Sequence, residues 1–211
     1  ADPAALHLAG PDDGVLVRAG VTPAADFLPK GAITAVAWVR IDQPTEWGGI
    51  IGCFQDNGPK EAGFVLGYTK TGFLFGLAAK GAARPDGFGS MTYLRGKTAY
   101  EPGRWYHVAG VYDGNRMRLY VNGVADGTSD EQSGDILYAP SAPFTIGRYK
   151  DADEDFPLNG AVKEVLLCPH AVPAEQLAAH FAADRALAER PAGAGGGPRF
   201  TIEPYLQAAS R

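Results

Sequence analysis

Positively charged side chains are scarce in this chain of 211 residues, and no segment gathers them. The sequence holds 19 Lys and Arg against 24 Asp and Glu, which gives a formal net charge of −5. Binding to nucleic acid draws on counterion release at a dense basic surface. The composition therefore predicts no nucleic-acid partner.

Long apolar runs are missing as well. No stretch approaches the ~20 consecutive apolar residues that a membrane-spanning helix requires, and no signal peptide is recognisable. The first residue is Ala1 and not Met, which fits either a processed secreted protein or a trimmed piece of one. We expect no membrane span.

Cysteine is rare, since the sequence has only Cys53 and Cys168. They are either two buried thiols that act as small hydrophobes or a disulfide formed in an oxidising compartment. We expect that the strand ending near Cys53 and the last core strand can share one sheet, which would permit a bridge. The separation of the two Cα atoms decides between the alternatives. Nothing near either thiol predicts a lowered pKa, so we expect neither to be catalytic.

The stretch RWYHVAGVYDGNRMRLYVNG, residues 104–123, is the most informative segment that is present. Side chains alternate with period two before and after Asp113-Gly114, which indicates two paired strands. Asp113-Gly114 and Asn122-Gly123 supply the positive backbone angles of tight hairpin turns. A hairpin of this kind is a framework and not a catalytic device.

Turn-forming residues are plentiful, with 28 Gly and 16 Pro placed mostly between apolar runs. That pattern is typical of many short strands with frequent turns. A chain of this length suits one all-β domain with appendages.

The hairpin at 104–123 resembles the signature of laminin-G-like, concanavalin-A-like domains, whose strands read roughly W-x-H-V-A-x-x-Y-D-G and then L-Y-V-D/N-G. The resemblance runs in order over about residues 5–182, through segments 31–40, 47–52, 63–68, 72–77, 143–148, 156–167 and 171–181. It implies an all-β fold, a two-sheet antiparallel jelly-roll sandwich with a short C-terminal helix. Over residues 5–170 we expect burial of Trp38, Val111, Leu119 and Ile146.

The C-terminal part has a different character. Pro173 predicts the first turn of a helix, with Leu177, Ala178, Phe181 and Arg185 along one face, docked through Leu177 and Phe181. The Gly-rich segment 191–198 predicts a flexible linker. We therefore expect a sandwich with its helix over 1–190, a linker over 191–198, and the start of a following domain over 199–211.

Pro204-Tyr205-Leu206-Gln207 resembles the opening strand of the β-sandwich that precedes the catalytic domain in purple-acid-phosphatase-like, calcineurin-like metallophosphoesterases. The resemblance implies that this chain is the N-terminal accessory module of a larger secreted hydrolase. It also implies a secreted, cell-surface or periplasmic location of bacterial type.

Catalytic groups do not emerge from the sequence. Glucanases of this superfamily need paired carboxylates on one strand, whereas the acidic run 151–155 predicts a loop and VKEVLLC offers Glu164 alone. The four histidines have neither triad nor zinc-ligand spacing. They are His7, His107, His170 and His180. We predict that this chain is not an enzyme.

Calcium is the one metal that the residues favour, since hard oxygen ligands occur in several turns. These are Asp12 and Asp13, Asp56 and Asn57, and the loop with Asp151, Asp153, Glu154 and Asp155. Relatives hold a structural ion beside an Asp of a G-x-I-D-E-V strand, but here Lys163 replaces that Asp. An ammonium would repel the ion and could pair with Asp12 or Asp13, so the resemblance implies no calcium there. The 151–155 loop is a second candidate, against the alternative of plain solvated charge.

Ligand contacts in sandwiches of this type come from aromatic and polar side chains at loops or on an exposed sheet face. Candidates beside turns are Trp47, Tyr93, Tyr100, Tyr138 and Tyr149. Tyr106, Arg118 and Tyr120 are expected to point away from the face that carries Met117, Leu119 and Val121.

These observations predict a recognition module for carbohydrate or cell-surface glycan. One alternative is a structural spacer that packs on its own downstream catalytic domain. The other is a glycan-active hydrolase.

Overall fold

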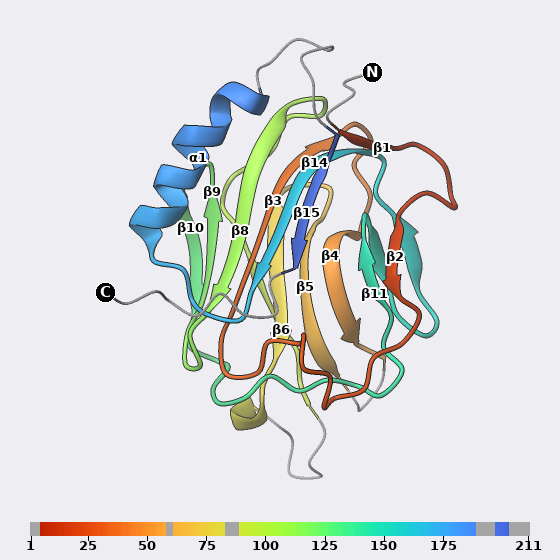
Figure 1. Cartoon of the computed structure of the whole chain (residues 1–211), viewed down its shortest axis with the longest axis vertical. Coiled ribbons are helices and arrows are strands. Elements are labelled where there is room, and N and C mark those ends of the chain that lie inside the picture. Colours follow the sequence, from red (N-terminus) through yellow and green to blue (C-terminus); the bar gives the residue numbers. More distant parts are fainter. Residues whose placement is uncertain (1–4, 58–60, 83–88, 189–196, 203–211) are drawn as a thin grey trace.

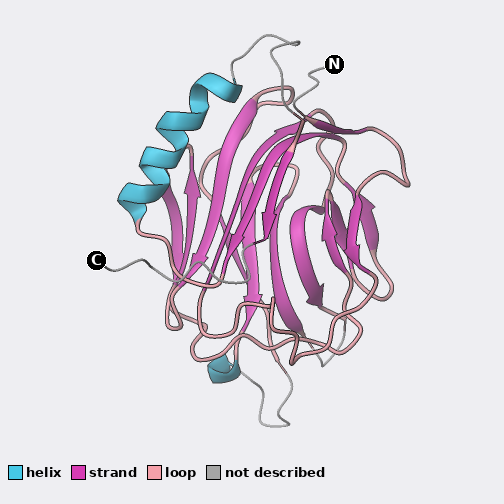
Figure 2. Cartoon of the chain, viewed as in Figure 1, coloured by secondary structure: helices cyan, strands magenta, loops and turns pink. Residues whose placement is uncertain are grey.

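The computed structural model describes residues 5–57, 61–82, 89–188 and 197–202. Its strands form two stacked sheets that are antiparallel except for one terminal pair, and the one α-helix of the described residues lies on the outer side of the larger sheet (Figure 1). Strands dominate the described part of the chain, as Figure 2 shows. The predicted jelly-roll sandwich is confirmed.

The larger sheet has seven strands. Their order is β1 (Leu6–Leu8), β14 (Gly160–Cys168), β3 (Ile33–Ile41), β8 (Trp105–Tyr112), β9 (Met117–Val121) and β10 (Val124–Ser129). The seventh strand, β15 (Arg199–Ile202), pairs in parallel with β14.

The second sheet has six strands, in the order β2 (Val15–Arg18), β11 (Phe144–Ile146), β4 (Gly48–Gln55), β5 (Ala62–Tyr68), β6 (Phe73–Ala78) and β7 (Thr92–Arg95). A small ribbon of β12 (Arg148–Lys150) and β13 (Asp155–Pro157) lies against β4. A short 3-10 turn, η1 (Lys80–Ala82), follows β6. The acidic run 151–155 was expected to be a loop throughout. Its last residue, Asp155, is instead the first residue of β13.

The predicted hairpin forms through β8 and β9, with Val108 opposite Val121. Its turns use Gly114 at φ 96° and Asn122 at φ 52°, backbone angles that most residues adopt only at a cost. Leu119 and Ile146 are buried in the core between the sheets, as predicted. Tyr106 also points into this core, because its spacing of two from Val108 places both on the inner face. The expectation that it points outward was wrong.

Helix α1 (Ala174–Ala188) starts directly after Pro173 and covers the outer face of the seven-stranded sheet. Leu177 is buried against Val111 and its neighbours, and the Phe181 ring stacks on Trp38 with centroids 5.7 Å apart. These are the two docking residues that the sequence predicted. Trp38 and Val111 are therefore buried beneath the helix and not between the sheets.

The docked face of α1 differs from the predicted one in its other members. His180 and Asp184 face the sheet together with Leu177 and Phe181, whereas Ala178 and Arg185 are exposed. Positions i, i+3, i+4 and i+7 share one face of a helix, which explains the set that docks.

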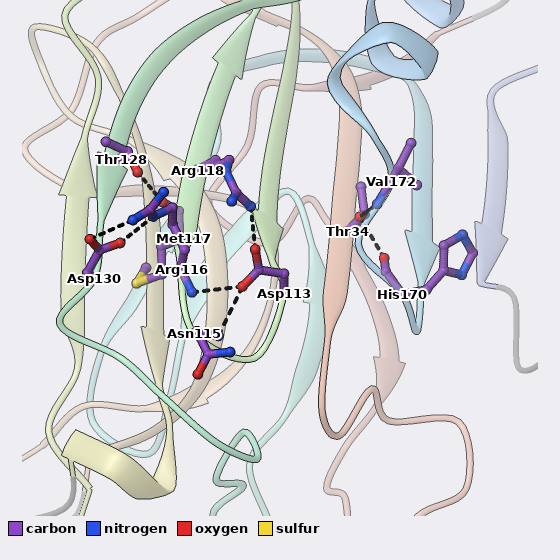
Figure 3. A network of polar contacts seen from close by, with 10 residues as sticks. All are labelled: Thr34, Asp113, Asn115, Arg116, Met117, Arg118, Thr128, Asp130, His170 and Val172. Atoms are coloured by element: carbon purple, nitrogen blue, oxygen red, sulfur yellow. Dashed lines mark hydrogen bonds and ion pairs between the residues drawn. The ribbon is translucent and has the colours of Figure 1, made fainter.

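The segment that leads into α1 is held by Thr34. Its hydroxyl donates to the carbonyl of His170 at 2.7 Å and accepts from the Val172 amide at 2.9 Å (Figure 3). Both bonds tie the start of the helix to β3.

Cys53 and Cys168 do not form a disulfide. Cys53 lies in β4 of the six-stranded sheet and Cys168 in β14 of the seven-stranded sheet. The expectation that they can share a sheet was wrong, because β4 and β14 belong to different layers. Burial raises the pKa of the Cys53 thiol to about 12.

Most of the predicted linker, residues 191–196, lies outside the described residues, as do 203–211. Residues 199–202, expected to open a following domain, extend the sandwich's own sheet as β15. No helix of the described residues is long and apolar enough to cross a membrane.

Close approach of the two sheets depends on Gly110 in β8. A Cβ built there would meet the Phe75 ring at 2.4 Å. We expect Gly110→Ala to lower the free energy of unfolding by about 1–3 kcal/mol through overpacking, measured by chemical denaturation. Gly31→Ala is the control, since the nearest atom to its Cβ is a carboxylate oxygen at 3.8 Å. Equal stability of the two variants would contradict this packing.

Candidate functional site

Trp47 is the centre of an aromatic cluster on the six-stranded sheet. Its indole lies 5.3 Å from the ring of Tyr93 and 5.5 Å from that of Tyr149, between centroids. The guanidinium of Arg95 lies over the same indole at 5.2 Å. The three aromatic residues are separate candidates in the sequence, and the structure brings them together.

The cluster lies on the outer face of the sheet, away from the main core. Tyr149 packs there with Phe54, Val65 and Leu74, while Trp47, Tyr93 and Met91 cover them and remain half-buried. Gly76 makes room for this layer, because a Cβ at that position would meet the Tyr93 ring at 2.9 Å. The aromatic layer therefore covers the outer face of this sheet, as helix α1 covers that of the other sheet.

Two tyrosine hydroxyls of this cluster converge on one carboxylate. Tyr93 and Tyr149 both donate to Oδ2 of Asp56, and their own hydroxyl oxygens are 2.9 Å apart. Burial raises the pKa of both tyrosines, so both hydroxyls remain protonated donors. Asp56 thereby fixes the rings on which Trp47 lies.

Asp151, from the acidic loop, organises the turn beside Asp56. Its Oδ1 accepts from the amides of Asp153 and Glu154 at 3.1 and 2.8 Å. Its Oδ2 accepts from the Asn57 side chain at 2.9 Å, the Gln55 side chain at 3.2 Å and the Asp56 amide at 3.3 Å. This buried carboxylate therefore acts as the anchor of the loop.

Three carboxylates, those of Asp56, Asp151 and Glu154, offer oxygens within 4.8 Å of one another. Burial and the Asp151 carboxylate raise the pKa of Asp56, and burial with both neighbouring carboxylates raises that of Glu154. Burial alone would also raise the pKa of Asp151, but its hydrogen bonds outweigh that effect and lower it. A cation would relieve this repulsion.

An oxygen suited to such a cation is present. Within the described residues, Oδ1 of Asp56 is buried and has no hydrogen-bond partner. Carboxylate and amide oxygens from Asp56, Asn57 and Glu154 are the ligand types that calcium prefers. The residues present thus fit the calcium that the sequence favoured, although Asp56 and Glu154 replace Asp153 and Asp155 in the cluster.

The other predicted metal residues have separate surroundings. Asp153 is exposed, and Asp155 pairs with Arg148 and Lys150. Asp13 accepts from the amides of Ala9 and Gly10, both at 2.8 Å, and so closes the first turn. Lys163, expected to repel calcium near Asp12 and Asp13, lies with its ammonium over the Trp105 ring at 4.6 Å.

A surface cavity of about 320 Å³ opens beside Trp47. Trp47 and Phe156 provide two of its walls, and Phe156 keeps 37% of its surface exposed. The rest of the lining includes Gln43, Pro44, Thr45 and Asn159. Apolar rings beside a few polar groups are the usual composition of a small-molecule site.

Four of the remaining ligand candidates are buried in structural positions. Tyr100 donates to the Thr69 carbonyl at 2.6 Å, and Tyr138 donates to the Pro29 carbonyl at 2.7 Å. The Tyr106 hydroxyl accepts from the Glu101 amide at 3.0 Å, and Tyr120 lies beneath α1. These side chains stabilise the fold and do not line the cavity.

Arg118 is the one remaining candidate that points outward, on β9 of the seven-stranded sheet. Its guanidinium pairs with Asp113 at 2.7 Å, and the neighbouring Arg116 pairs with Asp130 (Figure 3). Asp113 also accepts from the amides of Asn115 and Arg116, so it holds the hairpin turn. Arg118 therefore belongs to a surface ion-pair network.

Sequence reasoning missed Arg95 and Phe156 as members of the site. The available signal for Arg95 was its spacing of two from Tyr93, because residues two apart on a strand lie on the same face. Phe156 follows the acidic loop directly, and an aromatic residue beside turn-forming residues was the available signal.

Comparisons with known proteins agree with this architecture. Residues 12–178 match the family model described as the concanavalin A-like lectin/glucanases superfamily. Pappalysin-1 of Mus musculus is 29% identical and that of Homo sapiens 28% identical over 144 residues, or 63% of this chain. The match spans 8% of the length of those two relatives.

Solved structures share the fold at low sequence identity. The CBM40 of a Ruminococcus gnavus IT-sialidase, bound to α2,3-sialyllactose, has a TM-score of 0.57 at 16% identity, covering 81% of this chain and 97% of that one. Domain 4 of an extracellular GH43 arabinanase from Geobacillus stearothermophilus, with arabinotriose, has a TM-score of 0.52 at 18% identity, covering 79% and 75%. A SAP-like pentraxin from Limulus polyphemus has a TM-score of 0.51 at 19% identity, covering 81% and 76%.

Asp151 provides a direct test of the loop's construction. Asp151→Ala removes an acceptor for five donors, and each buried donor left unpaired costs about 1–3 kcal/mol. We expect a loss of at least about 2 kcal/mol in chemical denaturation. Asp153→Ala, at an exposed neighbour, should stay within about 0.5 kcal/mol of the parent protein. Similar losses for both variants would contradict the anchoring role.

Proposed function

The chain belongs to the concanavalin A-like lectin/glucanases superfamily, and from that premise we propose that it is a non-catalytic carbohydrate-recognition module. The proposed glycan-binding surface is the cavity beside Trp47. The observation that carries the proposal is the joint placement of Trp47 and the exposed Phe156 around one cavity of about 320 Å³.

Rigidity of the Trp47 indole supports this assignment. Tyr93 and Tyr149 pack against it, Arg95 lies over it, and Asp56 holds both tyrosine hydroxyls. An aromatic side chain that is already held in place loses little conformational entropy when a ligand binds. Sugars present apolar C–H faces to such rings, and their hydroxyls need polar partners, which Gln43, Thr45 and Asn159 of the lining can supply.

Two of the solved structures of this fold, the CBM40 and domain 4 of the arabinanase, are bound to sialyllactose and to arabinotriose. These ligands support a saccharide as the ligand class here. Glu46 of the lining pairs with Lys70 at 2.7 Å, which offsets its charge. We propose a neutral or weakly acidic oligosaccharide.

A calcium ion beside this surface is part of the proposal. Asp56, Asn57 and Glu154 would hold it, and Asp151 would maintain the loop that carries Glu154. When bound, the ion would neutralise the carboxylate cluster and offer a coordination position to ligand hydroxyls. Asp56 links the ion to the aromatic layer, because it also accepts from Tyr93 and Tyr149.

The wider context of the module is also a proposal. The resemblance of residues 204–207 to the start of a metallophosphoesterase β-sandwich supports an accessory module of a larger secreted hydrolase. The alternatives are a structural spacer and a glycan-active hydrolase. The sequence that follows residue 211 tests this context, since a metallophosphoesterase ligand set would be recognisable there.

Substitution of Trp47 tests the glycan site. We expect the parent chain to bind an oligosaccharide on a glycan array, and Trp47→Ala to weaken that binding about 10- to 100-fold, as expected for the loss of about 1.4–2.8 kcal/mol of aromatic contact. Trp105→Ala is the matched control, because Trp105 is a half-buried indole on the other sheet. Equal weakening by both variants would reject the site. Absence of binding to any glycan would favour the spacer.

Calcium addition tests the metal proposal. An ion that binds only the folded state stabilises it by about 2.7 kcal/mol at 100 times its dissociation constant. We expect millimolar CaCl2 to raise the melting temperature by several degrees and Glu154→Gln to remove most of the shift. Asp12→Asn should retain it, because Lys163 replaces the ligand of the site near Asp12. If only Asp12→Asn abolished the calcium-induced rise in melting temperature, the ion would bind near Asp12 and not at Glu154.

A further inference from the structure

A second group of metal-ligating side chains lies on the opposite side of the sandwich, between β14 and α1. Glu164 comes from β14, and His180 and Asp184 come from the docked face of α1. Their ligand atoms lie within 4.8 Å of one another. The carboxylate side chains are 13% and 14% exposed and the imidazole 29%, so the group is mostly enclosed but open on one side.

The imidazole and the two carboxylates are close but not tightly hydrogen-bonded. Nε2 of His180 lies 3.4 Å from Oε2 of Glu164 and 3.2 Å from Oδ2 of Asp184. Zinc binds nitrogen and oxygen ligands at about 2.0–2.2 Å in tetrahedral geometry, which places neighbouring ligand atoms about 3.3–3.6 Å apart. One buried atom, Oε2 of Glu164, has no hydrogen-bond partner among the described residues.

The surroundings orient these ligands. Nδ1 of His180 lies 2.9 Å from Nε2 of His107, a residue of β8 that is fully buried. The tautomer of His180 that can bind a metal through Nε2 carries its proton on Nδ1, which can donate to Nε2 of His107. Metal-bound histidines are held in this way by a hydrogen bond from the second ring nitrogen.

The other carboxylate oxygens already have a partner. Nη2 of Arg199, in β15, lies 2.9 Å from Oε1 of Glu164 and 3.3 Å from Oδ1 of Asp184. Arg199 thus uses the oxygens that face away from His180 and leaves Oε2 and Oδ2 toward it. The guanidinium also offsets part of the charge of two closely placed carboxylates.

From this arrangement we propose that Glu164, His180 and Asp184 form a Zn²⁺ site that fastens α1 to the sandwich. Three protein ligands leave the fourth tetrahedral position for water. The site is independent of the proposed glycan surface, which lies on the other sheet. Its ligand set of one imidazole and two carboxylates suits Zn²⁺ better than Ca²⁺, which takes oxygen ligands.

The spacing of the four histidines from one another gave no sign of this site, but the spacing between a histidine and a carboxylate did. His180 and Asp184 are four residues apart, and therefore share a helix face. Glu164 could be added only when β14 was known to lie beneath that face.

Titration with ZnCl2 tests the site on the whole chain of 211 residues. After treatment with EDTA, we expect one equivalent of Zn²⁺ to bind and to raise the melting temperature by several degrees, while CaCl2 leaves this site unoccupied. His180→Ala and Asp184→Asn should each abolish the Zn²⁺ shift. His170→Ala, at an exposed histidine outside the group, should retain it.

Co²⁺ supplies a second readout that does not depend on stability. Binding in place of Zn²⁺ should give the intense visible absorption of tetrahedral Co²⁺ in the parent chain and in His170→Ala, and no such band in Asp184→Asn. If His180→Ala fails to fold, the Asp184→Asn spectrum still decides. The proposal is overturned if Zn²⁺ does not bind at micromolar concentration, or if Asp184→Asn and His170→Ala bind it equally.

Discussion

A sandwich of two sheets has two outer faces, and in this protein both carry apolar side chains that need cover. Burial of apolar surface is the main favourable contribution to folding, so an uncovered face would weaken the fold and expose a large apolar patch. Helix α1 covers the seven-stranded sheet through Leu177 and Phe181. An aromatic layer covers the six-stranded sheet through Trp47, Tyr93 and Tyr149. Both candidate sites of the molecule lie where these covers meet the sheets.

The two covers differ in what they leave accessible. The helix brings ionisable side chains of α1 over β14 and encloses most of their surface, which suits a metal ion. The aromatic layer consists of single rings held by hydrogen bonds to Asp56, and it leaves a cavity beside Trp47. A rigid ring next to a cavity can bind a ligand with small ordering cost. We therefore place the proposed recognition site on the six-stranded side of the molecule.

Much of the fold was predictable because its signals are local. Period-two alternation and the turns at Asp113-Gly114 and Asn122-Gly123 identified the β8–β9 hairpin, and Pro173 marked the beginning of α1. Two predictions were wrong: that Tyr106 points outward, and that the two cysteines can share a sheet. Both depend on strand register and sheet order, which local sequence does not determine. The site was predictable only in part. Trp47, Tyr93 and Tyr149 were recognised singly, but their meeting at Asp56 follows from the pairing of strands far apart in the sequence.

The central claim is that ligand recognition occurs at the aromatic cover of the six-stranded sheet. Backbone amide chemical shifts of the isotope-labelled chain, followed during titration with an oligosaccharide that binds, test this claim without any substitution. The account predicts that the largest shifts occur at Trp47, Thr45 and Phe156, with smaller ones at Tyr93 and Arg95. Shifts concentrated on α1 and the outer face of the seven-stranded sheet would contradict it.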